Sequence, residues 1–118
     1  MDKPSRVKPT VPYTVLESLD VRVGTIRAVE DVPRSDKLVR LRVGFGDHER
    51  VILAGLKKER PYPKVLIGMQ ALFVVNLEPR KLMGEVSEGM LFDLGYVDGI
   101  VPVLAVPERP VPDGIRAG

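Results

Sequence analysis

The run DVRVGTIRAVEDV at residues 20–32 constrains the fold more than any other feature of the chain. Side chains of an extended strand alternate between two faces, so the two valines before Gly24 share one face while Ile26 and Ala28 lie on the other. Gly24 lies where the apolar residues change from one face to the other. A β-bulge or a sharp coil at this position would turn the later apolar residues inward again. A small barrel needs a strand of this kind to bend around its corner. This stretch therefore predicts a β-barrel.

A hairpin and three shorter apolar runs supply the remaining strands. In KLVRLRVGFGDHERVILAG, residues 37–55, apolar residues alternate with Arg40 and Arg42. This alternation predicts a hairpin whose arginines point outward and whose turn is GFGD. Five main strands with short connections fit a small closed or partly open barrel better than a βαβ sheet, with a sandwich as the alternative. The later apolar runs are residues 69–77, 89–97 and 99–107.

The ends of the chain differ in character from its middle. Residues 1–12 mix three prolines with three cations, which predicts a flexible basic arm. The remaining residues, 13–118, suffice for one ordinary domain. Thr14 and Glu17 have capping-box spacing, which predicts one short helix near the start of that domain. The connector at residues 57–68 contains two prolines and leaves room for at most a short helical turn, and the proline-rich C-terminal tail is expected to pack as an irregular extension.

The side chains that most catalytic and metal sites require are scarce. The chain has no cysteine and His48 is its one histidine, so neither a zinc site nor a nucleophile–base pair can be completed from them. The carboxylates are scattered, and no glycine-rich phosphate loop is present. We therefore expect a non-catalytic protein without a cofactor. Because no apolar segment is long enough for a membrane span or a leader, we also expect a cytoplasmic protein with no membrane partner.

The segment NLEPRKLMGEVSEGM, residues 76–90, is longer than a simple connection between strands needs. Its two adjacent cations can contact phosphates, while its asparagine and serine can hydrogen-bond bases or sugar hydroxyls. Met90 could place a soft apolar surface under a base. In barrels of the oligonucleotide-binding (OB) type, ligands lie on the central strands between two such loops. The candidate RNA-contacting residues of these strands and this loop are Arg40, Arg42, Asn76, Arg80, Lys81, Ser87 and Met90.

Several of these residues also have ordinary interpretations. The tripeptide PRK alone would suit a solvated turn, Arg40 and Arg42 a solvated strand face, and Met90 the core. Residues 1–68 carry 14 Lys and Arg against 9 Asp and Glu, so the first part of the chain could meet a polyanion. No aromatic side chain is expected on the candidate surface, which argues against the stacking of successive bases. The pattern favours recognition of a folded RNA by shape and backbone.

Four motifs in this order resemble the tRNA-binding domain of bacterial methionyl-tRNA synthetases, of synthetase-associated cytokine precursors and of free-standing CsaA-type proteins. The motifs are DVRVGTI, PRSDKL, NLEPRKLMG and SEGM. The resemblance implies an all-β fold, a five-stranded OB barrel that forms a homodimer and binds the outer corner of tRNA. It places RNA contacts on Asn76, Arg80, Lys81, Ser87 and Met90, with Lys37 in the neighbouring loop. The chain departs from the family pattern at Val32, Ser35 and Ala54.

Two other functions remain open beside tRNA binding. CsaA-type proteins are described as export-related chaperones, so the resemblance also implies unfolded polypeptide or export machinery as partners. The apolar, proline-rich stretch VPVLAVPERPVP is consistent with a groove for such a polypeptide. A third interpretation is a structural module that joins other proteins through dimerisation.

Overall fold

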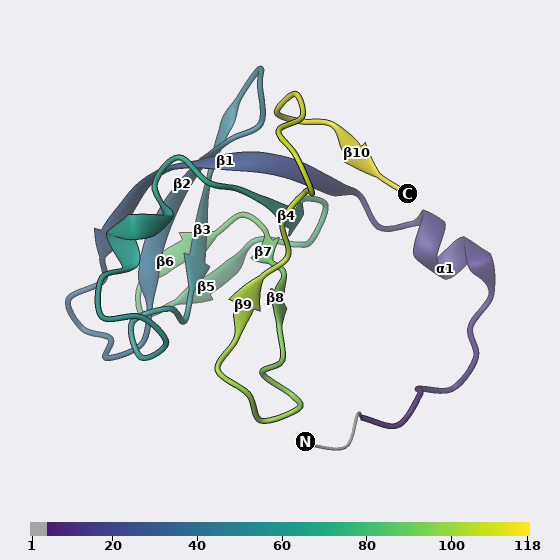
Figure 1. Ribbon diagram of the computed structural model, residues 1–118, viewed down its shortest axis with the longest axis horizontal. Coiled ribbons are helices and arrows are strands. Elements are labelled where there is room, and N and C mark those ends of the chain that lie inside the picture. Colours follow the sequence, from purple (N-terminus) through teal and green to yellow (C-terminus); the bar gives the residue numbers. More distant parts are fainter. Residues whose placement is uncertain (1–4) are drawn as a thin grey trace.

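The computed structural model describes residues 5–118 (Figure 1). A strongly curved sheet forms the body of the molecule, α1 lies to one side of it, and the long β8–β9 hairpin projects from it. Neither helical segment within residues 5–118 has the length and apolarity needed to cross a membrane. The elements are α1 (Tyr13–Glu17), β1 (Val21–Asp31), β2 (Val39–Gly44), β3 (Glu49–Ala54), the 3-10 helix η1 (Pro63–Leu66), β4 (Gln70–Val74), β5 (Arg80–Leu82), β6 (Glu85–Ser87), β7 (Met90–Leu91), β8 (Asp93–Leu94), β9 (Val103–Leu104) and β10 (Arg116–Ala117).

Five strands form a nearly closed antiparallel barrel in the order β3-β2-β1-β4-β7, and β10 pairs with the start of β1. The two edges of this path meet where Glu88 precedes β7. There the Glu88 N–H donates to the Val51 carbonyl oxygen over 2.8 Å, and the Val51 N–H donates to Glu88 Oε1 over 2.8 Å. The predicted all-β barrel of the OB type, with one short α-helix, is confirmed.

The long strand β1 changes face as predicted, but at a different residue. Its pairing with β2 is irregular between Ile26 and Ala28, which places the extra residue of the bulge at Arg27. Gly24 instead pairs regularly with β4 and points inward, where a Cβ would lie 2.6 Å from Val43 Cγ1 and 2.7 Å from the Phe45 ring. The predicted bulge at Gly24 is therefore wrong. Glycine is needed there because two core side chains occupy the space of a larger residue.

The β2–β3 hairpin forms as predicted and supplies much of the core. Val39, Leu41 and Val43 are buried, while the arginines between them are more exposed. The core is chiefly aliphatic, and its main aromatic contact is the edge-to-face pair of Phe45 and Phe73, with ring centroids 5.6 Å apart. The most deeply buried large side chains are Phe73, Ile26, Leu41, Ile52, Leu56, Val32 and Val43.

Two local predictions are wrong, and a third, the irregular C-terminal tail, holds except at its end. The apolar run at residues 89–97 is not one strand: β7 joins the barrel, whereas β8 leaves it to pair with β9. The helix α1 begins after Pro12 and has no side-chain capping bond, so the capping box expected at Thr14 does not form. The tail is largely irregular, but it ends in β10, and Asp113 accepts a hydrogen bond from Thr25 Oγ1 over 2.6 Å.

Candidate nucleic-acid interface

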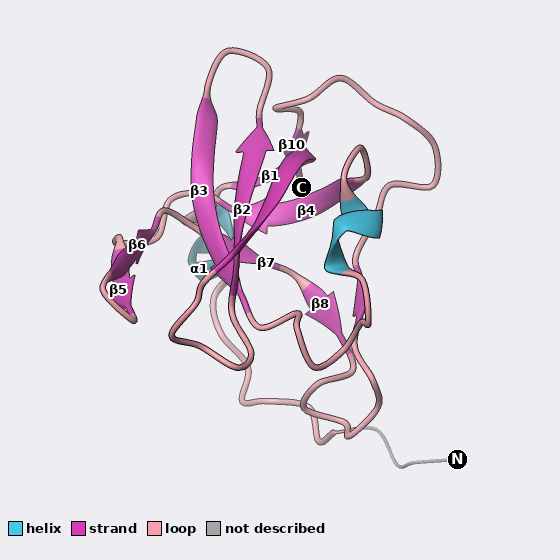
Figure 2. Ribbon diagram, turned by 90° about the vertical axis from the view of Figure 1, so that its left-hand side faces the viewer, coloured by secondary structure: helices cyan, strands magenta, loops and turns pink. Residues whose placement is uncertain are grey.

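The segment predicted to be a long binding loop is a small hairpin beside β3 (Figure 2). Strands β5 and β6 are antiparallel and pair Arg80 with Ser87 and Lys81 with Val86. The two-residue turn has positive φ at both positions, 51° at Met83 and 81° at the glycine that follows. Such a turn matches the twist of a tight hairpin. The polar residues of this segment therefore have defined positions on two paired strands.

The register of the β5–β6 hairpin sends its two adjacent cations to opposite faces. Residues directly across an antiparallel pair share a face. Arg80 therefore lies on the same side as Ser87, which is buried against the barrel. Lys81 lies on the solvent side with Val86, which is 49% exposed. The two cations would thus reach different parts of a ligand.

Leu82 and Ser87 attach the β5–β6 hairpin to the barrel. The side chain of Leu82 packs against a small buried cluster. The Ser87 hydroxyl accepts a hydrogen bond from the Leu53 N–H over 3.0 Å and donates one to the Gly89 carbonyl oxygen over 3.0 Å. Because both functions of the hydroxyl are used and the residue is 4% exposed, Ser87 holds the hairpin in place. The cluster that receives Leu82 consists of Val32, Leu38 and Leu53.

Arg40 and Arg42 point outward as predicted, but their charges are engaged in ion pairs. Glu30 Oε1 accepts from Arg40 Nε over 2.8 Å and from Arg42 Nε over 3.2 Å. Arg40 also pairs with Glu85 of β6 and so ties the hairpin to β2. The hydrogen bond from Arg40, followed by the charge of Arg42, lowers the pKa of the Glu30 carboxyl below its ordinary value. These arginines are therefore largely neutralised within the protein.

The loop between β1 and β2 is organised around its own polar groups and one lysine. The N–H groups of Lys37 and of the residue after it donate to Ser35 Oγ over 3.2 and 3.0 Å. Lys57 Nζ donates to the carbonyl oxygens of Val32 and Ser35 over 2.9 and 2.7 Å, and it pairs with Asp31. Lys57 thus holds the β1–β2 loop from inside, while Lys37 stays exposed on its surface.

A cleft of about 530 Å³ lies between the β1–β2 loop, the β5–β6 hairpin and the β8–β9 hairpin. We call it the hairpin cleft. Lys37 and Arg80 both line it, and neither has an ion-pair partner within residues 5–118. Tyr96, at the turn of the β8–β9 hairpin, also lines it and is 74% exposed. Its acidic lining residues are Glu59, Asp93 and Asp98.

The acidic residues of the hairpin cleft are not equivalent. Glu59 is largely buried, which raises the pKa of its carboxyl, although Arg60 donates to it over 3.0 Å. Asp98 accepts a hydrogen bond from the N–H of Ser5 over 3.0 Å. Asp93 has no hydrogen bond or ion pair to its carboxylate among the described residues, 5–118. It therefore offers both carboxylate oxygens to a ligand, whereas one oxygen of Asp98 is already used.

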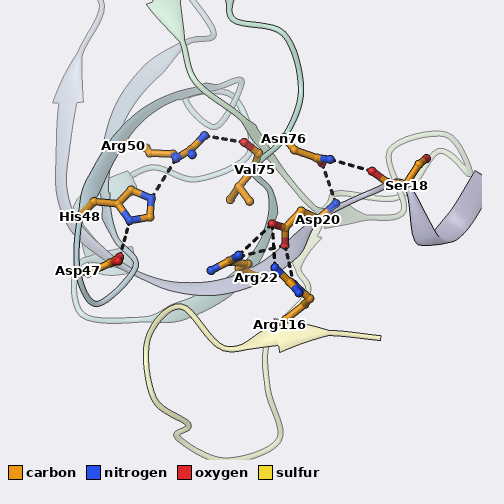
Figure 3. A network of polar contacts seen from close by, with 9 residues as sticks. All are labelled: Ser18, Asp20, Arg22, Asp47, His48, Arg50, Val75, Asn76 and Arg116. Carbon is orange, nitrogen blue, oxygen red and sulfur yellow. Dashed lines mark hydrogen bonds and ion pairs between the residues drawn. The ribbon is translucent and has the colours of Figure 1, made fainter.

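Asn76 lies outside the hairpin cleft, in a polar network near the end of α1 (Figure 3). Its Oδ1 accepts from the Asp20 N–H over 2.7 Å, and its Nδ2 donates to the Ser18 carbonyl oxygen over 2.8 Å. The Asp20 carboxylate in turn pairs with Arg22 at 3.0 Å and Arg116 at 3.2 Å. Hydrogen bonds first from Arg22 and then from Arg116 lower the pKa of the Asp20 carboxyl. Asn76 therefore joins the end of β4 to the chain between α1 and β1.

The structure thus divides the predicted residues into groups. Lys37 and Arg80 share the hairpin cleft, and Lys81 lies on the outer face of the β5–β6 hairpin. Arg40 and Arg42 line a separate hollow of about 420 Å³. Met90 is 45% exposed on β7, and Asn76 and Ser87 are bonded to backbone. Within residues 5–118, no three acidic or histidine side chains gather as a metal site would require.

Tyr96 was not among the residues predicted from the sequence. Its segment, LGYVDGI, continues an apolar run that predicts a buried strand. The structure places it in a turn after β8. The two glycines that flank YVD were the available signal, because glycines around a short polar or aromatic stretch are typical of turns.

Comparison with known proteins gives a family and a fold. Residues 21–116 match the model of a family described as "Putative tRNA binding domain". The chain is 37% identical over 112 residues to a methionine–tRNA ligase of Parabacteroides distasonis, covering 95% of this chain and 16% of the ligase. The chain thus spans about a sixth of the length of this curated relative.

Two solved structures resemble nearly the whole molecule. One is a MetRS related protein from Pyrococcus horikoshii, with a TM-score of 0.85, 33% identity, and coverage of 94% of this chain and 100% of that one. The other is the chaperone CsaA from Bacillus anthracis, with a TM-score of 0.76, 27% identity, and coverage of 93% and 100%.

Proposed function

Because the chain belongs to the tRNA-binding domain family, we propose that it is a non-catalytic protein that binds folded tRNA by shape and backbone. One observation carries the proposal beyond the family match. Lys37 comes from the β1–β2 loop and Arg80 from β5; they line the same cleft and have no ion-pair partner within residues 5–118. Unpaired cations that converge on one cleft suit the phosphates of a nucleic acid. A cytoplasmic location belongs to the same proposal, since tRNA acts there.

The proposed contacts are fewer than the residues expected from the sequence. Lys37 and Arg80 contact phosphates inside the hairpin cleft, and Lys81 contacts a neighbouring phosphate from the outer face of the β5–β6 hairpin. Arg42 and Met90 are both about half exposed, but neither lines the hairpin cleft: Arg42 lines the separate hollow, and Met90 lies on β7. Arg40, Asn76 and Ser87 act by holding the surface in shape, because their polar groups bond within the protein.

The test is a double variant, Lys37→Ala with Arg80→Ala, titrated with bulk tRNA at several salt concentrations. The plot of log K against log salt has a negative slope, and each lost phosphate contact should reduce the magnitude of that slope by about 0.7 to 0.9. A second double variant, Lys64→Ala with Arg109→Ala, removes the same charge from exposed cations that do not line the hairpin cleft. It should keep the wild-type slope. Equal losses from both variants would mean that only net charge matters and that the cleft is not the site.

We also propose that the protein acts as a homodimer, as the resemblance to the family implies. The supporting observation is α1, which has no buried residue. The apolar side chains of Val15 and Leu16 in α1, and of Leu19 just after it, are between 42% and 57% exposed. Sedimentation of the wild type and of Leu16→Glu tests this. The wild type should sediment as a dimer. The variant should sediment as a monomer with an unchanged far-UV circular dichroism spectrum. A monomeric wild type would reject the proposal.

Binding of unfolded polypeptide is a second candidate function, favoured by a hollow on another part of the barrel. This hollow, of about 570 Å³, is lined by the proline-rich segment Val106–Pro110 and by Met69. Both Val106 and Met69 are exposed, at 49% and 39%. If this function is real, the protein suppresses aggregation of a denatured client, excess tRNA does not compete, and Val106→Asp removes the effect. No suppression at stoichiometric protein would reject it.

A further inference from the structure

The β8–β9 hairpin presents a tyrosine on an ordered turn. Tyr96 is 74% exposed, and none of the aromatic rings in residues 5–118 pairs with it. The N–H groups of Asp98 and Ile100 each donate to the Gly95 carbonyl oxygen over 3.1 Å. Gly95, with φ of 103°, packs so closely on Ile100 that a Cβ would overlap that side chain. The ring therefore stands on a fixed turn, which reduces the entropy lost when it contacts a ligand.

Side chains of three chemical types line the hairpin cleft together with this ring. Lys37 and Arg80 supply positive charge, Tyr96 supplies an exposed aromatic face, and Asp93 supplies a carboxylate that has no partner among residues 5–118. An aromatic face stacks on a nucleobase, cations bind its phosphate, and a carboxylate accepts hydrogen bonds from N–H groups on the base edge. The volume of about 530 Å³ falls within the range of roughly 300 to 1,000 Å³ found for small-molecule pockets. One nucleotide matches this combination.

We propose that the hairpin cleft binds a single unpaired guanosine of the RNA, with the base on Tyr96, its pairing edge at Asp93, and its phosphate between Lys37 and Arg80. This site rests on the proposed RNA-binding function and adds a base-reading element to it. Guanine fits best because N1–H and N2–H lie side by side and can both donate to one carboxylate. Adenine and cytosine place a ring acceptor beside their amino group, and uracil has one N–H between two carbonyl oxygens, so these bases meet the Asp93 carboxylate less favourably.

The stacking part of the site is tested with tyrosine variants and bulk tRNA. Tyr96→Leu should lower affinity about 5- to 150-fold, the range that corresponds to loss of one stacked base. Tyr96→Phe should bind nearly as well as the wild type, since it keeps the ring. Tyr62 is a matched control, because it is 76% exposed and does not line the cleft; Tyr62→Leu should leave the affinity unchanged.

The base-reading part is tested with four RNA stem-loops that differ only in one bulged nucleotide. The wild type should prefer the guanosine bulge about tenfold, the discrimination typical of a two-bond contact to a base edge. Asp93→Asn keeps the shape of the side chain but offers only one acceptor oxygen, so it should lose that preference while retaining affinity for the other three bulges. Because the preference is a ratio between ligands, a merely structural effect of the substitution would not change it.

The results of these experiments distinguish failure of the guanosine site from failure of the proposed RNA-binding function. If the wild type binds tRNA and the Lys37 and Arg80 variants weaken it, but Tyr96→Leu does not, the guanosine site is rejected and RNA binding stands. Equal binding of the four bulges by the wild type rejects the guanosine assignment. If the wild type binds no RNA at low salt, the proposed function and this site are both rejected.

Discussion

Asn76 Nδ2 donates a hydrogen bond to the Ser18 carbonyl oxygen over 2.8 Å. The same side chain accepts a hydrogen bond from the Asp20 N–H. One side-chain amide therefore links the end of β4 to the segment between α1 and β1. An asparagine that the sequence motif places among the RNA contacts is thus fully used within the protein. Because Asn76 does not line the hairpin cleft, its supporting role can be measured independently of RNA contact.

Asn76→Ala should reduce stability without a specific effect on RNA binding. Loss of two neutral hydrogen bonds to backbone should lower the free energy of unfolding by about 1 to 2 kcal/mol. Urea denaturation measures this. The matched control is Lys81→Ala, an exposed residue whose removal should change stability by less than about 0.5 kcal/mol yet weaken tRNA binding. If the Asn76→Ala protein is as stable as the wild type but binds RNA much more weakly, Asn76 contacts RNA and the supporting role is wrong.

Ser87→Ala should destabilise the protein more than its size suggests. It leaves the buried Leu53 N–H and the Gly89 carbonyl oxygen without their partner. An unsatisfied buried group costs about 1 to 3 kcal/mol. Val86→Ala, on the exposed face of the same strand, is the control and should have little effect. Denaturant unfolding of both variants tests the difference, and equal stabilities would show that the Ser87 hydroxyl is dispensable to the fold.

Lys57→Met should weaken RNA binding even though Lys57 does not line the hairpin cleft. Without its ammonium group, the carbonyl oxygens of the β1–β2 loop lose their shared donor, and Lys37 is no longer held in position. We expect faster amide hydrogen exchange at Lys37 and a loss of tRNA affinity approaching that of Lys37→Ala. Lys58→Met is the control, since within residues 5–118 Lys58 forms only an exposed pair with Asp36 at 3.4 Å. Unchanged exchange at Lys37 would contradict this role.

The Asp20 ion pairs should make stability fall in acid. Arg22 first, and then Arg116, holds the pKa of the folded Asp20 carboxyl below its ordinary value. The unfolded chain therefore binds a proton at higher pH than the folded one. The stability that Asp20 adds is then present above about pH 4 and is lost as the pH falls through the folded pKa.

Asp20→Asn isolates this contribution from those of other carboxyls. The variant should be less stable than the wild type at pH 7, and the difference should shrink below about pH 4. Glu59 has the opposite effect on the pH dependence of stability, because burial raises the pKa of its carboxyl. This effect is the same in the wild type and in the variant, so it cancels in the difference. Urea denaturation at a series of pH values measures the difference. A gap that stays constant down to pH 2 would show that ionisation of Asp20 is not the cause.

The sequence predicted the barrel better than the site, for physical reasons. Alternation in β2 reports burial directly, so the direction of Arg40 was correct. The β5–β6 hairpin was missed because its strands have three residues each and its Met83–Gly84 turn lacks the usual Asn-Gly signal. A serine in a polar segment looks the same whether its hydroxyl is free or, as in Ser87, bonded to a neighbouring strand. Such partners depend on tertiary structure.

The most direct test of the central claim is a competition titration. Bulk tRNA, a short RNA duplex and an unstructured RNA of matched length compete for the wild type at low and near-physiological salt. We expect that tRNA binds best, that the preference persists at the higher salt, and that it depends on Lys37 and Arg80. If the three RNAs bind equally and their affinity falls steeply as the salt concentration rises, counterion release alone drives binding. That result would contradict recognition of folded tRNA by this domain.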